Sequence, residues 1–411
     1  MPETEMIRFS SADFEEAMDF MNMVFSMSGA STDFATLLPK LYRPDDRLMR
    51  DNLAIRRNGR LRAVVGSYPM QLQVGQAVLS VRGIGGVSTH PAERKSGLMR
   101  QLMLAALDEM DKEHCAMSIL GGQRQRYGYY GYERCGRIMT SGVNKSNLRH
   151  FFHERQSATV RFTRIMQEGT DQPENAVHLM KSWHDSQPVH MHRSETDFLT
   201  ILSSWYHRVW LASDDQERML GYLVANGDGT SVSELITADP KWILDIAAAW
   251  AQRQKSHDVH YNLPPWQTEA LRTLMTLGES VTIDSAYCFR INDWPLVLSS
   301  FLQVQGSLKT LAEGVLRLGV INSAAGPAEH QIQRTYALVW KNGRAECREL
   351  AGDPADRPDL LLDSLTATRL VFGPLSSECI LADADLFDPQ VARLLTSWFP
   401  LPVCILESDH I

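Results

Sequence analysis

The stretch that decides the fold covers residues 85–103 and reads GGVSTHPAERKSGLMRQLM. A short segment rich in β-branched residues leads into a proline turn, and a strongly apolar helical pattern follows at once. Between the two, the chain places the basic pair Arg94 and Lys95 before Ser96 and Gly97. We therefore expect a strand, a basic glycine turn and a helix in direct succession.

The expected helix has one apolar face, because its apolar residues recur at spacings of three and four: Leu98, Met99, Leu102, Met103, Ala106, Leu107 and Met110. Its first turn leaves backbone N–H groups without partners and carries a partial positive charge. Arg94, Lys95 and Arg100 add positive charge at the same end, which is unfavourable for the helix unless an anion binds there. A phosphate group would supply that anion.

Two common phosphate motifs do not fit this turn. A Walker loop needs a glycine directly before Lys95-Ser96, and the chain has Arg94 there. Gly83-Ile-Gly85 is no dinucleotide fingerprint, because a strand and not a helix follows it. The alternative without a ligand is an ordinary solvated turn with a helix cap.

The composition is that of a folded globular protein with several domains. The chain has 411 residues, of which 44% are hydrophobic and 22% are charged, so we expect two or three domains. The net charge of -8 argues against nucleic acid or an anionic membrane as a partner and is compatible with cationic ligands. The acidic N-terminus and the lack of a long apolar run predict neither a signal peptide nor a membrane span.

Cysteine and histidine usage predicts no metal. The six cysteines are scattered and form no C-x-x-C pair, which signals neither a disulfide framework nor a zinc site and fits a reducing cytoplasm. The pairs His190-x-His192 and His257-x-x-His260 lack a third ligand. His90, before a proline, is expected to cap or pack and not to catalyse.

Residues 6 to 150 alternate between α and β patterns. An apolar stripe over 14–25 predicts a helix, and turn-forming residues at 58–59 and 75–76 predict two hairpins. The opening stretch comes next, and a strand is predicted over 116–120. This order of elements is typical of an α/β domain with a mixed sheet.

Residues 151 to about 290 repeat this theme without a basic glycine turn. Strands are predicted at 219–224 and 232–236, across the turn Asn-Gly-Asp-Gly, and a helix is predicted at 242–250.

From Trp294 onward we expect another α/β domain, with helices at 296–302 and 308–316, a hairpin at 341–344, an apolar segment at 360–370 and a final helix at 389–398. The expected domains are 1–150, 151–292 and 293–411.

The turn resembles the pyrophosphate loop of the GNAT acetyltransferases, Q/R-x-x-G-x-G/A, with Met99 in place of the final small residue in Arg94-x-x-Gly97-x-Met99. A second motif agrees with it. Residues 121–136 read GGQRQRYGYYGYERCG, and Tyr-x-x-x-Gly-aromatic-Glu is what the superfamily places after its fifth strand. The resemblance implies an N-acetyltransferase with acetyl-CoA as co-substrate, in which Tyr127 protonates the departing thiolate of coenzyme A.

The same segment contains three further tyrosines, Tyr129, Tyr130 and Tyr132, for which half-buried packing is the preferred interpretation. Packing alone is the alternative for Tyr127 as well.

The resemblance also implies which residues hold the coenzyme. The strand that ends at Val87-Ser88-Thr89 would splay from its neighbour and pair with the pantetheine amides, as an added strand does. The amides of the following loop would cradle the pyrophosphate. The expected coenzyme-binding residues are Val87, Ser88, Thr89, Arg94, Lys95, Ser96, Gly97, Leu98, Met99, Arg100 and Gln123.

Direct transfer to an amine needs a group that accepts a proton, because an alkylamine has a pKa of about 10.4. No His or Glu in the first domain is an obvious candidate.

The whole chain resembles the enhanced intracellular survival (Eis) acetyltransferases, with two GNAT-like mixed-sheet domains in tandem and a sterol-carrier-protein-like α/β domain. In that family the chain end returns to the active site, which implies that the carboxylate of Ile411 is the base. The tail is then expected to be an apolar strand followed by an acid-rich turn, although the family more usually ends in an aromatic residue.

The sequence does not identify the acceptor amine. The resemblance implies an aminoglycoside, a lysine side chain or a polyamine, and a homo-oligomer that can be a hexamer. Asp33, Glu407 and Asp409 are candidates for lining the acceptor pocket, with helix capping and solubility as the alternatives. The tail can also be a simple edge strand. The rival functions are a lipid-binding protein and a coenzyme-binding regulator without turnover.

Overall fold

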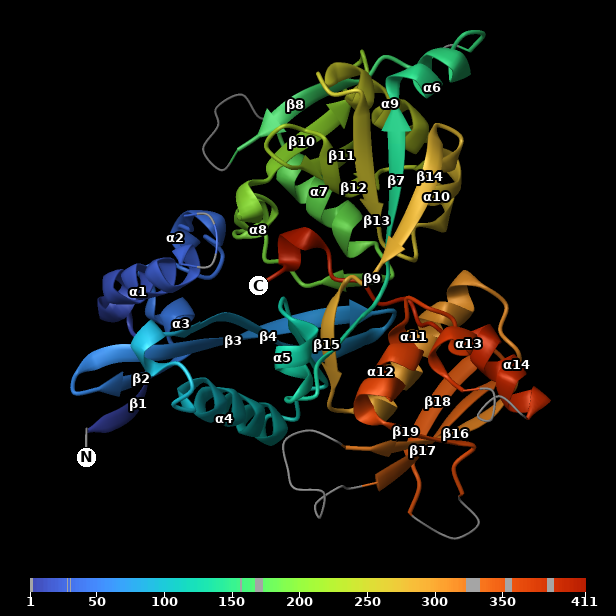
Figure 1. Cartoon of the computed structure of the whole chain (residues 1–411). Helices are drawn as coiled ribbons and strands as arrows, with labels where there is room; N and C mark the ends of the chain where they lie inside the picture. The colour runs from blue at the N-terminus through green and yellow to red at the C-terminus, as the bar shows by residue number, and fades with distance from the viewer. Residues whose placement is uncertain are drawn as a thin grey trace.

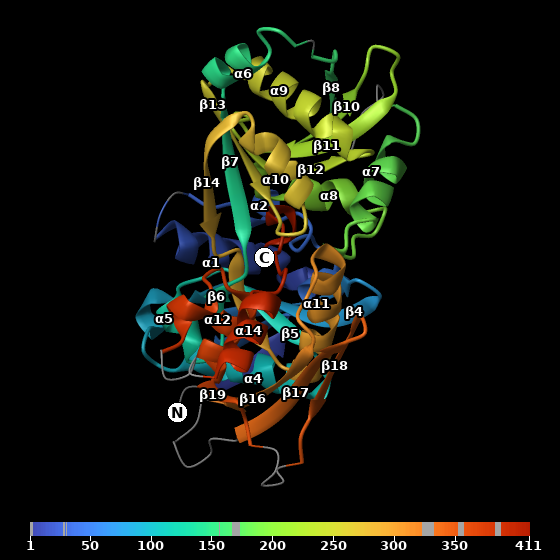
Figure 2. The ribbon, with the colours of Figure 1, turned by 90° about the vertical axis from the view of Figure 1, so that its right-hand side faces the viewer.

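The computed structural model describes residues 3–27, 29, 31–155, 157–166, 173–322, 333–351, 357–382 and 388–411. Within these residues the strands form an eight-stranded, a seven-stranded and a four-stranded sheet, each covered by helices. The three parts surround the C-terminus, which lies at their junction in both ribbon views (Figures 1 and 2). The mixed α/β fold class predicted from the sequence is confirmed.

The first sheet holds the opening stretch. Its strand order is β1 (Thr4–Arg8), β2 (Asn52–Arg57), β3 (Arg60–Val74), β4 (Ala77–Thr89), β5 (Met117–Leu120), β15 (Tyr287–Ile291) and β6 (Glu133–Cys135), with β9 (Val189–Met191) beside β3. Its helices are η1 (Ser11–Asp13), α1 (Phe14–Ser26), α2 (Phe34–Leu37), α3 (Asp46–Met49), η2 (Pro91–Glu93), α4 (Leu98–Lys112) and α5 (Arg124–Gly128). The helices expected over 14–25 and after Gly97 are therefore confirmed.

Both hairpin turns predicted in this domain are present. Asn58 and Gly59 have φ angles of 50° and 73°, and Gly75 has a φ of 58°. Asn and Gly adopt left-handed backbone at little cost, and the right-handed twist of the strands favours such turns. These turns fix the register of β2, β3 and β4.

Strands β4 and β5 run parallel only as far as Ile84 and Leu120, and then separate. On the other side of β4, the pairing with β3 shifts register between Gly66 and Val64, where Gly86 has a φ of 59°. The end of β4 is thus a bulged strand with one free edge. This is the splayed strand end expected from the sequence.

The second sheet has the order β14 (Gly278–Asp284), β7 (Ile138–Asn144), β13 (Asp258–Leu263), β12 (Ser231–Thr237), β11 (Met219–Ala225), β10 (Arg208–Ser213) and β8 (Arg161–Ile165). Its helices are α6 (Lys145–Phe151), α7 (Ala176–Asp185), α8 (Phe198–Leu202), η3 (Ser204–Tyr206), η4 (Pro240–Trp242), α9 (Ile243–Arg253) and α10 (Thr268–Met275). The predicted strand pair and the helix that follows it are present.

The first two sheets exchange strands. Strand β7 precedes the second domain in sequence but pairs with β13 and β14 inside it. Strand β15 follows the second domain but inserts between β5 and β6 of the first sheet. The sheets therefore do not follow the ranges 1–150 and 151–292 strictly, and the expected division of the chain stays a prediction.

The third sheet has the order β18 (Arg344–Glu349), β17 (Gln333–Lys341), β16 (Gly314–Ile321) and β19 (Leu360–Asp363). Its helices are α11 (Trp294–Leu308), α12 (Ser364–Phe372), α13 (Ser377–Ile380) and α14 (Pro389–Trp398). The hairpin at 341–344 and the helix at 389–398 agree with the sequence. The helix predicted over 308–316 is wrong, because α11 ends at Leu308 and β16 follows, paired on both edges. The resemblance to a sterol carrier protein stays a prediction.

The last thirteen residues form an extended tail. It leaves α14, is held by hydrogen bonds from Leu401 N to Val371 O and from Arg137 N to Val403 O, and ends in η8 (Glu407–Asp409). The expected apolar strand is wrong, since residues 401–406 join no strand. The side chains are nevertheless buried, so packing and not a sheet ladder fixes the path of the tail.

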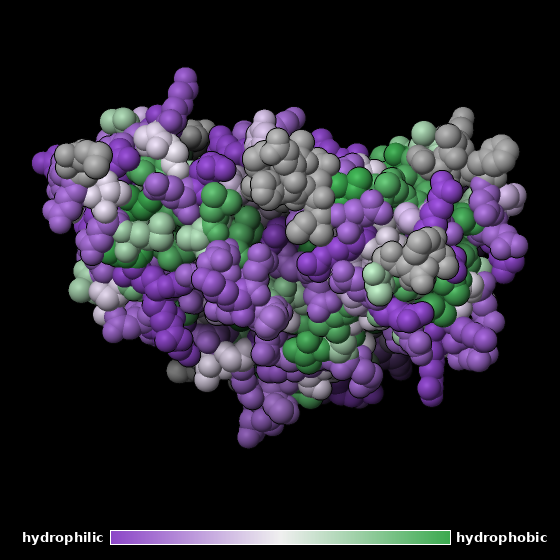
Figure 3. Space-filling model, turned by 90° about the horizontal axis from the view of Figure 1, so that it is seen from below, coloured by the Kyte–Doolittle hydropathy of each residue, from purple (hydrophilic) through white to green (hydrophobic). Residues whose placement is uncertain are grey.

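The face of the molecule formed by the first and third domains is mostly hydrophilic, with hydrophobic side chains in small separate groups (Figure 3). Among the described residues, no helix is long and apolar enough to cross a membrane.

Candidate active site

A cavity of about 900 Å³ opens at the end of β4. Its walls come from the loop before α4, from α5, from α1 and α2, from the tail, and from Trp205 of the second domain. Most of the site residues predicted from the sequence line it: Val87, Thr89, Arg94, Lys95, Gly97, Leu98, Met99, Arg100, Gln123, Tyr127 and Ile411. The fold thus brings together motifs that are far apart in the sequence.

Two predicted coenzyme-binding residues do not line the cavity. Ser88 is buried, and its hydroxyl donates to the carbonyl of Gly86 at 3.0 Å. Ser96 is exposed, and its hydroxyl donates to the carbonyl of Glu93 at 2.5 Å. Both side chains stabilise the local turn, so any role in coenzyme binding would fall to their backbone.

The loop before α4 has the geometry of an anion cradle. Lys95 and Gly97 have left-handed φ angles of 69° and 84°, and no side chain caps the helix at Gly97. In the described part of the chain, the N–H groups of residues 97–100 have no acceptor. Arg94, Lys95 and Arg100 are exposed around them. Converging amides and basic side chains at a helix start suit a phosphate.

Tyr127 lies in α5 with a side chain that is only 6% exposed. Burial raises the pKa of its phenol above the usual 10, and the nearby Arg126 opposes this effect. The phenol is therefore protonated at neutral pH and can act as an acid. A Cβ at Gly122 would lie 2.3 Å from the Tyr127 ring, so a glycine is needed there.

The other tyrosines of this segment have different roles. Tyr132 is fully buried and its hydroxyl lies 2.6 Å from that of Ser118, which is the packing role expected. Tyr129 is 77% exposed, so the packing role expected for it is wrong. Tyr130 is buried but also lines the cavity.

The tail places Ile411 in the same cavity as Tyr127. The hydroxyl of Tyr287 lies 3.2 Å from both the backbone nitrogen and a terminal oxygen of Ile411. The rings of Tyr287 and His410 stack with centroids 4.2 Å apart. These contacts hold the terminal carboxylate beside the free edge of β4.

Two glycines of β4 make room for Ile411. A Cβ at Gly83 would lie 2.6 Å from Ile411 Cγ1, and a Cβ at Gly85 would lie 2.3 Å from Ile411 Cγ2. The sequence shows this pair as Gly83-Ile-Gly85, which fails as a dinucleotide motif. Its spacing of two on one strand face is a signal for close approach by another segment, and sequence reasoning missed that meaning.

An ion network buried in the second domain holds the tail. Arg193 donates to both carboxylate oxygens of Asp409, at 3.0 and 2.8 Å, and to both oxygens of Glu234, at 3.0 and 3.1 Å. All three side chains are nearly inaccessible. Burial opposes ionisation of Glu234, but the charge of Arg193 offsets this, so the pKa of Glu234 lies well below its usual value. Arg193 therefore helps to hold η8 in place.

Two groups around the network have shifted pKa values. Burial lowers the pKa of Lys40 to about 7, although Asp409 opposes the shift, and Lys40 Nζ donates to the Ser408 carbonyl at 2.6 Å. Burial lowers the pKa of His410 to about 4. The imidazole next to the terminal residue is thus neutral at pH 7.

The acidic residues considered for the acceptor pocket do not line the cavity. Asp33 caps α2 by accepting from Thr36. Asp409 is bound to Arg193, and Glu407 lies 3.6 Å from His207. The capping alternative for Asp33 is therefore the correct one.

The histidines make ordinary contacts. His90 accepts from the N–H of Ala92 and caps η2, as expected. His192 lies 3.0 Å from the side chains of both Gln71 and Gln73. No group of three or more His, Cys, Asp or Glu residues in the described ranges is arranged to hold a metal ion.

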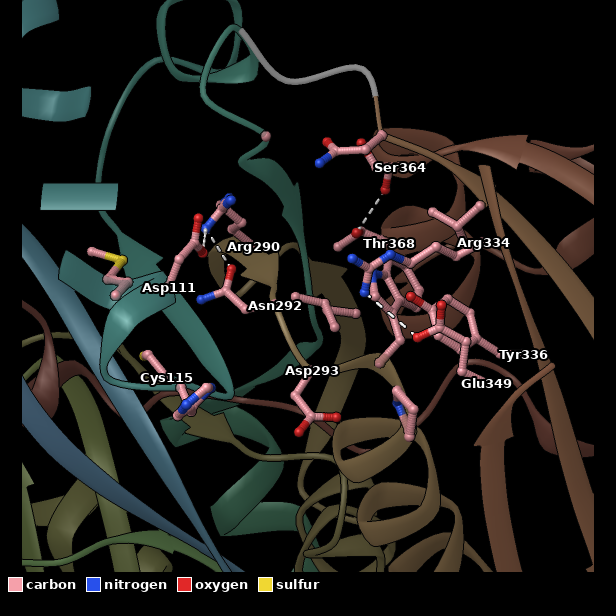
Figure 4. Close-up of a pocket in the computed structure, with 18 residues that line it drawn as sticks. Asp111, Cys115, Arg290, Asn292, Asp293, Arg334, Tyr336, Glu349, Ser364 and Thr368 are labelled. Atoms are coloured by element: carbon pink, nitrogen blue, oxygen red, sulfur yellow. Dashed lines mark hydrogen bonds and ion pairs between the residues drawn. The ribbon is translucent and has the colours of Figure 1, made fainter. Parts of the chain in front are cut away.

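A second cavity of about 590 Å³ lies between α4, the β15–α11 connection and the third sheet (Figure 4). It is lined by polar side chains, including Asp111, Arg290 and Asn292, and by the stacked pair Trp294 and Tyr336. Neither the anion cradle nor Tyr127 lines it, so it is separate from the candidate active site.

Comparison with known proteins gives a domain match and a fold match. Residues 5–135 match the model of the acetyltransferase (GNAT) domain. A probable N-acyltransferase of unknown function from Enterococcus faecalis is 15% identical, with full coverage of both chains and a TM-score of 0.70. A GCN5-related N-acetyltransferase from Kribbella flavida is 18% identical, with 100% of this chain and 99% of that chain covered and a TM-score of 0.66. No curated protein matches.

The match defines residues 5–135 as an acetyltransferase domain of the GNAT type, a class of domain that uses an acyl-CoA donor. The similarity to solved structures extends the fold over the whole chain. Eis1 from Mycobacterium abscessus is similar in fold, with 12% identity, coverage of 99% of this chain and 100% of that chain, and a TM-score of 0.63.

Proposed function

We propose that the protein transfers an acetyl group directly from acetyl-CoA to an amine. The observation that carries this proposal is the single cavity that the anion cradle, Tyr127 and the Ile411 carboxylate share. The cradle and the free edge of β4 would hold the diphosphate and the pantetheine arm, and would thereby aim the thioester at Tyr127.

The chain's own residues then have two proton roles. The amine nitrogen attacks the thioester carbonyl, a C–N bond forms, and the C–S bond breaks. Tyr127 donates its proton to the departing sulfur, and the Ile411 carboxylate receives the proton that the amine loses, directly or through water. The products are an acetamide and free coenzyme A.

Binding and turnover test the proposal separately. Acetyl-CoA should raise the melting temperature while ATP and NADH do not, because a ligand held only by the native state stabilises it. Tyr127→Phe should lower kcat about tenfold or more and retain coenzyme binding. Tyr129→Phe is the matched control, because Tyr129 is exposed. An unchanged kcat for Tyr127→Phe would remove this residue from the chemistry, and selective binding without any thiol release would favour a coenzyme-binding regulator.

Self-association and a cytoplasmic location belong to the same proposal. Light scattering on the purified chain would measure the oligomeric state, and a monomer at micromolar concentration would contradict the expected homo-oligomer.

A further inference from the structure

One part of the cavity wall is apolar. It is formed by Val24 and Phe25 of α1, Phe34 and Leu38 of the α2 region, and Trp205 of η3. Val24, Phe34 and Leu38 are buried. None of these five residues is a predicted coenzyme-binding residue, so this wall is where an acceptor would lie.

The aromatic side chains of this wall are held in place. The rings of Phe25 and Phe34 meet edge to face with centroids 4.7 Å apart. Trp205 has a left-handed backbone, with φ of 62° and ψ of 26°, which is a rare conformation for a bulky residue and persists only where the surroundings impose it. Its indole N–H donates to the His410 carbonyl at 3.3 Å. The wall is therefore a preformed surface and includes a residue from the second domain.

The charges around the cavity are mostly positive. Its basic lining residues are Arg94, Lys95, Arg100 and Arg126. The acidic lining side chain among the described residues is Glu93, which already pairs with Arg57 at 2.6 Å. The carboxylate of Ile411 is thus the one lining acid of the described chain without a cationic partner.

We propose that the acceptor is an amine with one ammonium group on an apolar, preferably aromatic, body, and not a polycation such as an aminoglycoside or a polyamine. This inference rests on the proposed function. A single ammonium group can lie against the Ile411 carboxylate while its apolar body packs on Phe25 and Trp205. A second ammonium group would lie against apolar side chains without a counter-ion, which is strongly unfavourable.

The test is thiol release from acetyl-CoA by the full-length protein with two amines of nearly equal length. Hexylamine ends in a methyl group where 1,5-diaminopentane carries a second ammonium group. We expect kcat/KM to be about 100-fold higher for hexylamine, because the second charge finds no partner. The kcat/KM for phenethylamine should be at least as high as that for hexylamine, and the kcat/KM for kanamycin should be low.

Substitutions in the apolar wall test the same inference by changing the protein instead of the amine. Trp205→Ala should raise KM for phenethylamine about tenfold with KM for acetyl-CoA unchanged, because it removes an aromatic contact to the acceptor. It also removes the hydrogen bond to the His410 carbonyl, and that loss should lower kcat for all amines alike. Tyr206→Ala is the control, because Tyr206 is exposed and does not line the cavity. Phe25→Glu should shift the ratio between the two linear amines about tenfold toward the diamine, because it supplies the missing acid.

The outcomes separate the two proposals. Preference for 1,5-diaminopentane or kanamycin over hexylamine would overturn the acceptor class and leave acetyl transfer intact. Unchanged amine selectivity in both wall variants would also overturn it. Thiol release that no amine stimulates would overturn the proposed function and this inference with it.

Discussion

The first and second domains begin their main helices in opposite ways. In the first domain, α4 starts at Gly97 without a side-chain cap, and residues 97–100 line the cavity. In the second domain, the carboxylate of Asp239 accepts from the N–H of Lys241 at the start of η4, directly before α9. A side-chain acid thus occupies in one domain the position that stays open to an anion in the other.

The separated strands of the two domains also differ. Strands β12 and β13 pair only at two positions, the last being Val232 with Tyr261, and Glu234 lies two residues further on. There Glu234 binds Arg193, which binds Asp409 of the tail. The second domain therefore holds, through Arg193, the chain end that lines the candidate active site. The same type of mixed sheet can bind a ligand or hold another segment of the chain. Which of the two it does depends on whether side chains of the protein occupy the helix start and the free strand edge.

The largest expected effect comes from moving the terminal carboxylate. Two glycines added after Ile411 should lower kcat about 100-fold or more with coenzyme binding retained, because the carboxylate proposed as the base leaves its position beside the cavity. Steady-state thiol release and the melting temperature with acetyl-CoA measure the two effects. A normal kcat would show that the tail has no part in the chemistry.

Removal of Arg193 should mainly affect stability. Arg193→Met leaves Asp409 and Glu234 buried without their cation, so we expect a loss of about 3–5 kcal/mol in the free energy of unfolding. Chemical denaturation measures this. Arg218→Met is the matched control, since Arg218 is two-thirds exposed in its pair with Asp214 and should change stability by less than about 1 kcal/mol. Equal effects of the two substitutions would contradict a special role of the network.

A carboxylate placed in the loop before α4 should give the first domain an acidic side chain at its helix start, as Asp239 does in the second domain. Ser96→Asp introduces a carboxylate at the open helix start, and we expect KM for acetyl-CoA to rise about tenfold or more through repulsion of the diphosphate. Ser96→Asn keeps the size without the charge and should have a much smaller effect. Equal KM values for the two variants would show that the loop does not bind an anion.

Lowering the pH should reduce the free energy of unfolding through His410 in the tail. The pKa of His410 is about 4 in the folded chain, below the usual 6.5, so the folded state binds fewer protons than the unfolded state between these values. Stability from this group is present above pH 6.5 and is lost as the pH falls toward 4. Between pH 7 and pH 5 we expect a loss of roughly 1–2 kcal/mol from this residue. The melting temperature of His410→Gln should depend less on pH over this range, and an identical pH profile would contradict the assignment.

The smallest effect is expected at the second helix start. Asp239→Ala removes the cap of η4 and should cost about 0.5–1 kcal/mol of stability without a change in kcat or KM. A clear change in KM for acetyl-CoA would show that the second domain takes part in coenzyme binding.

Local chemistry made much of the fold predictable. Asn342 and Gly343 adopt the left-handed φ angles that a tight hairpin needs, and Asp388 before Pro389 caps α14 as such a pair does. The prediction failed over 308–316, because a short apolar run fits a buried strand as well as a helix. The sheets that β7 and β15 join were not predicted, since no pattern in either strand specifies its partner.

The candidate site was predictable where one continuous motif carries it. The loop at 94–100 and Tyr127 each stand in a readable pattern, and both reach the cavity. Arg193 and Trp205 stand in no motif, because their contacts to the tail depend on how two domains pack. Gly83 and Gly85 form a recognisable pair in the sequence. Their role could not be predicted, because it depends on contact with Ile411, more than three hundred positions away.

The strand exchange has a consequence for synthesis on the ribosome. Strand β6 joins the first sheet through β15, which emerges only after the whole second domain has been made. Until then the nascent chain exposes an unpaired edge of β5, a surface that favours association with other chains. The first sheet therefore cannot be completed until the chain has been synthesised past the second domain.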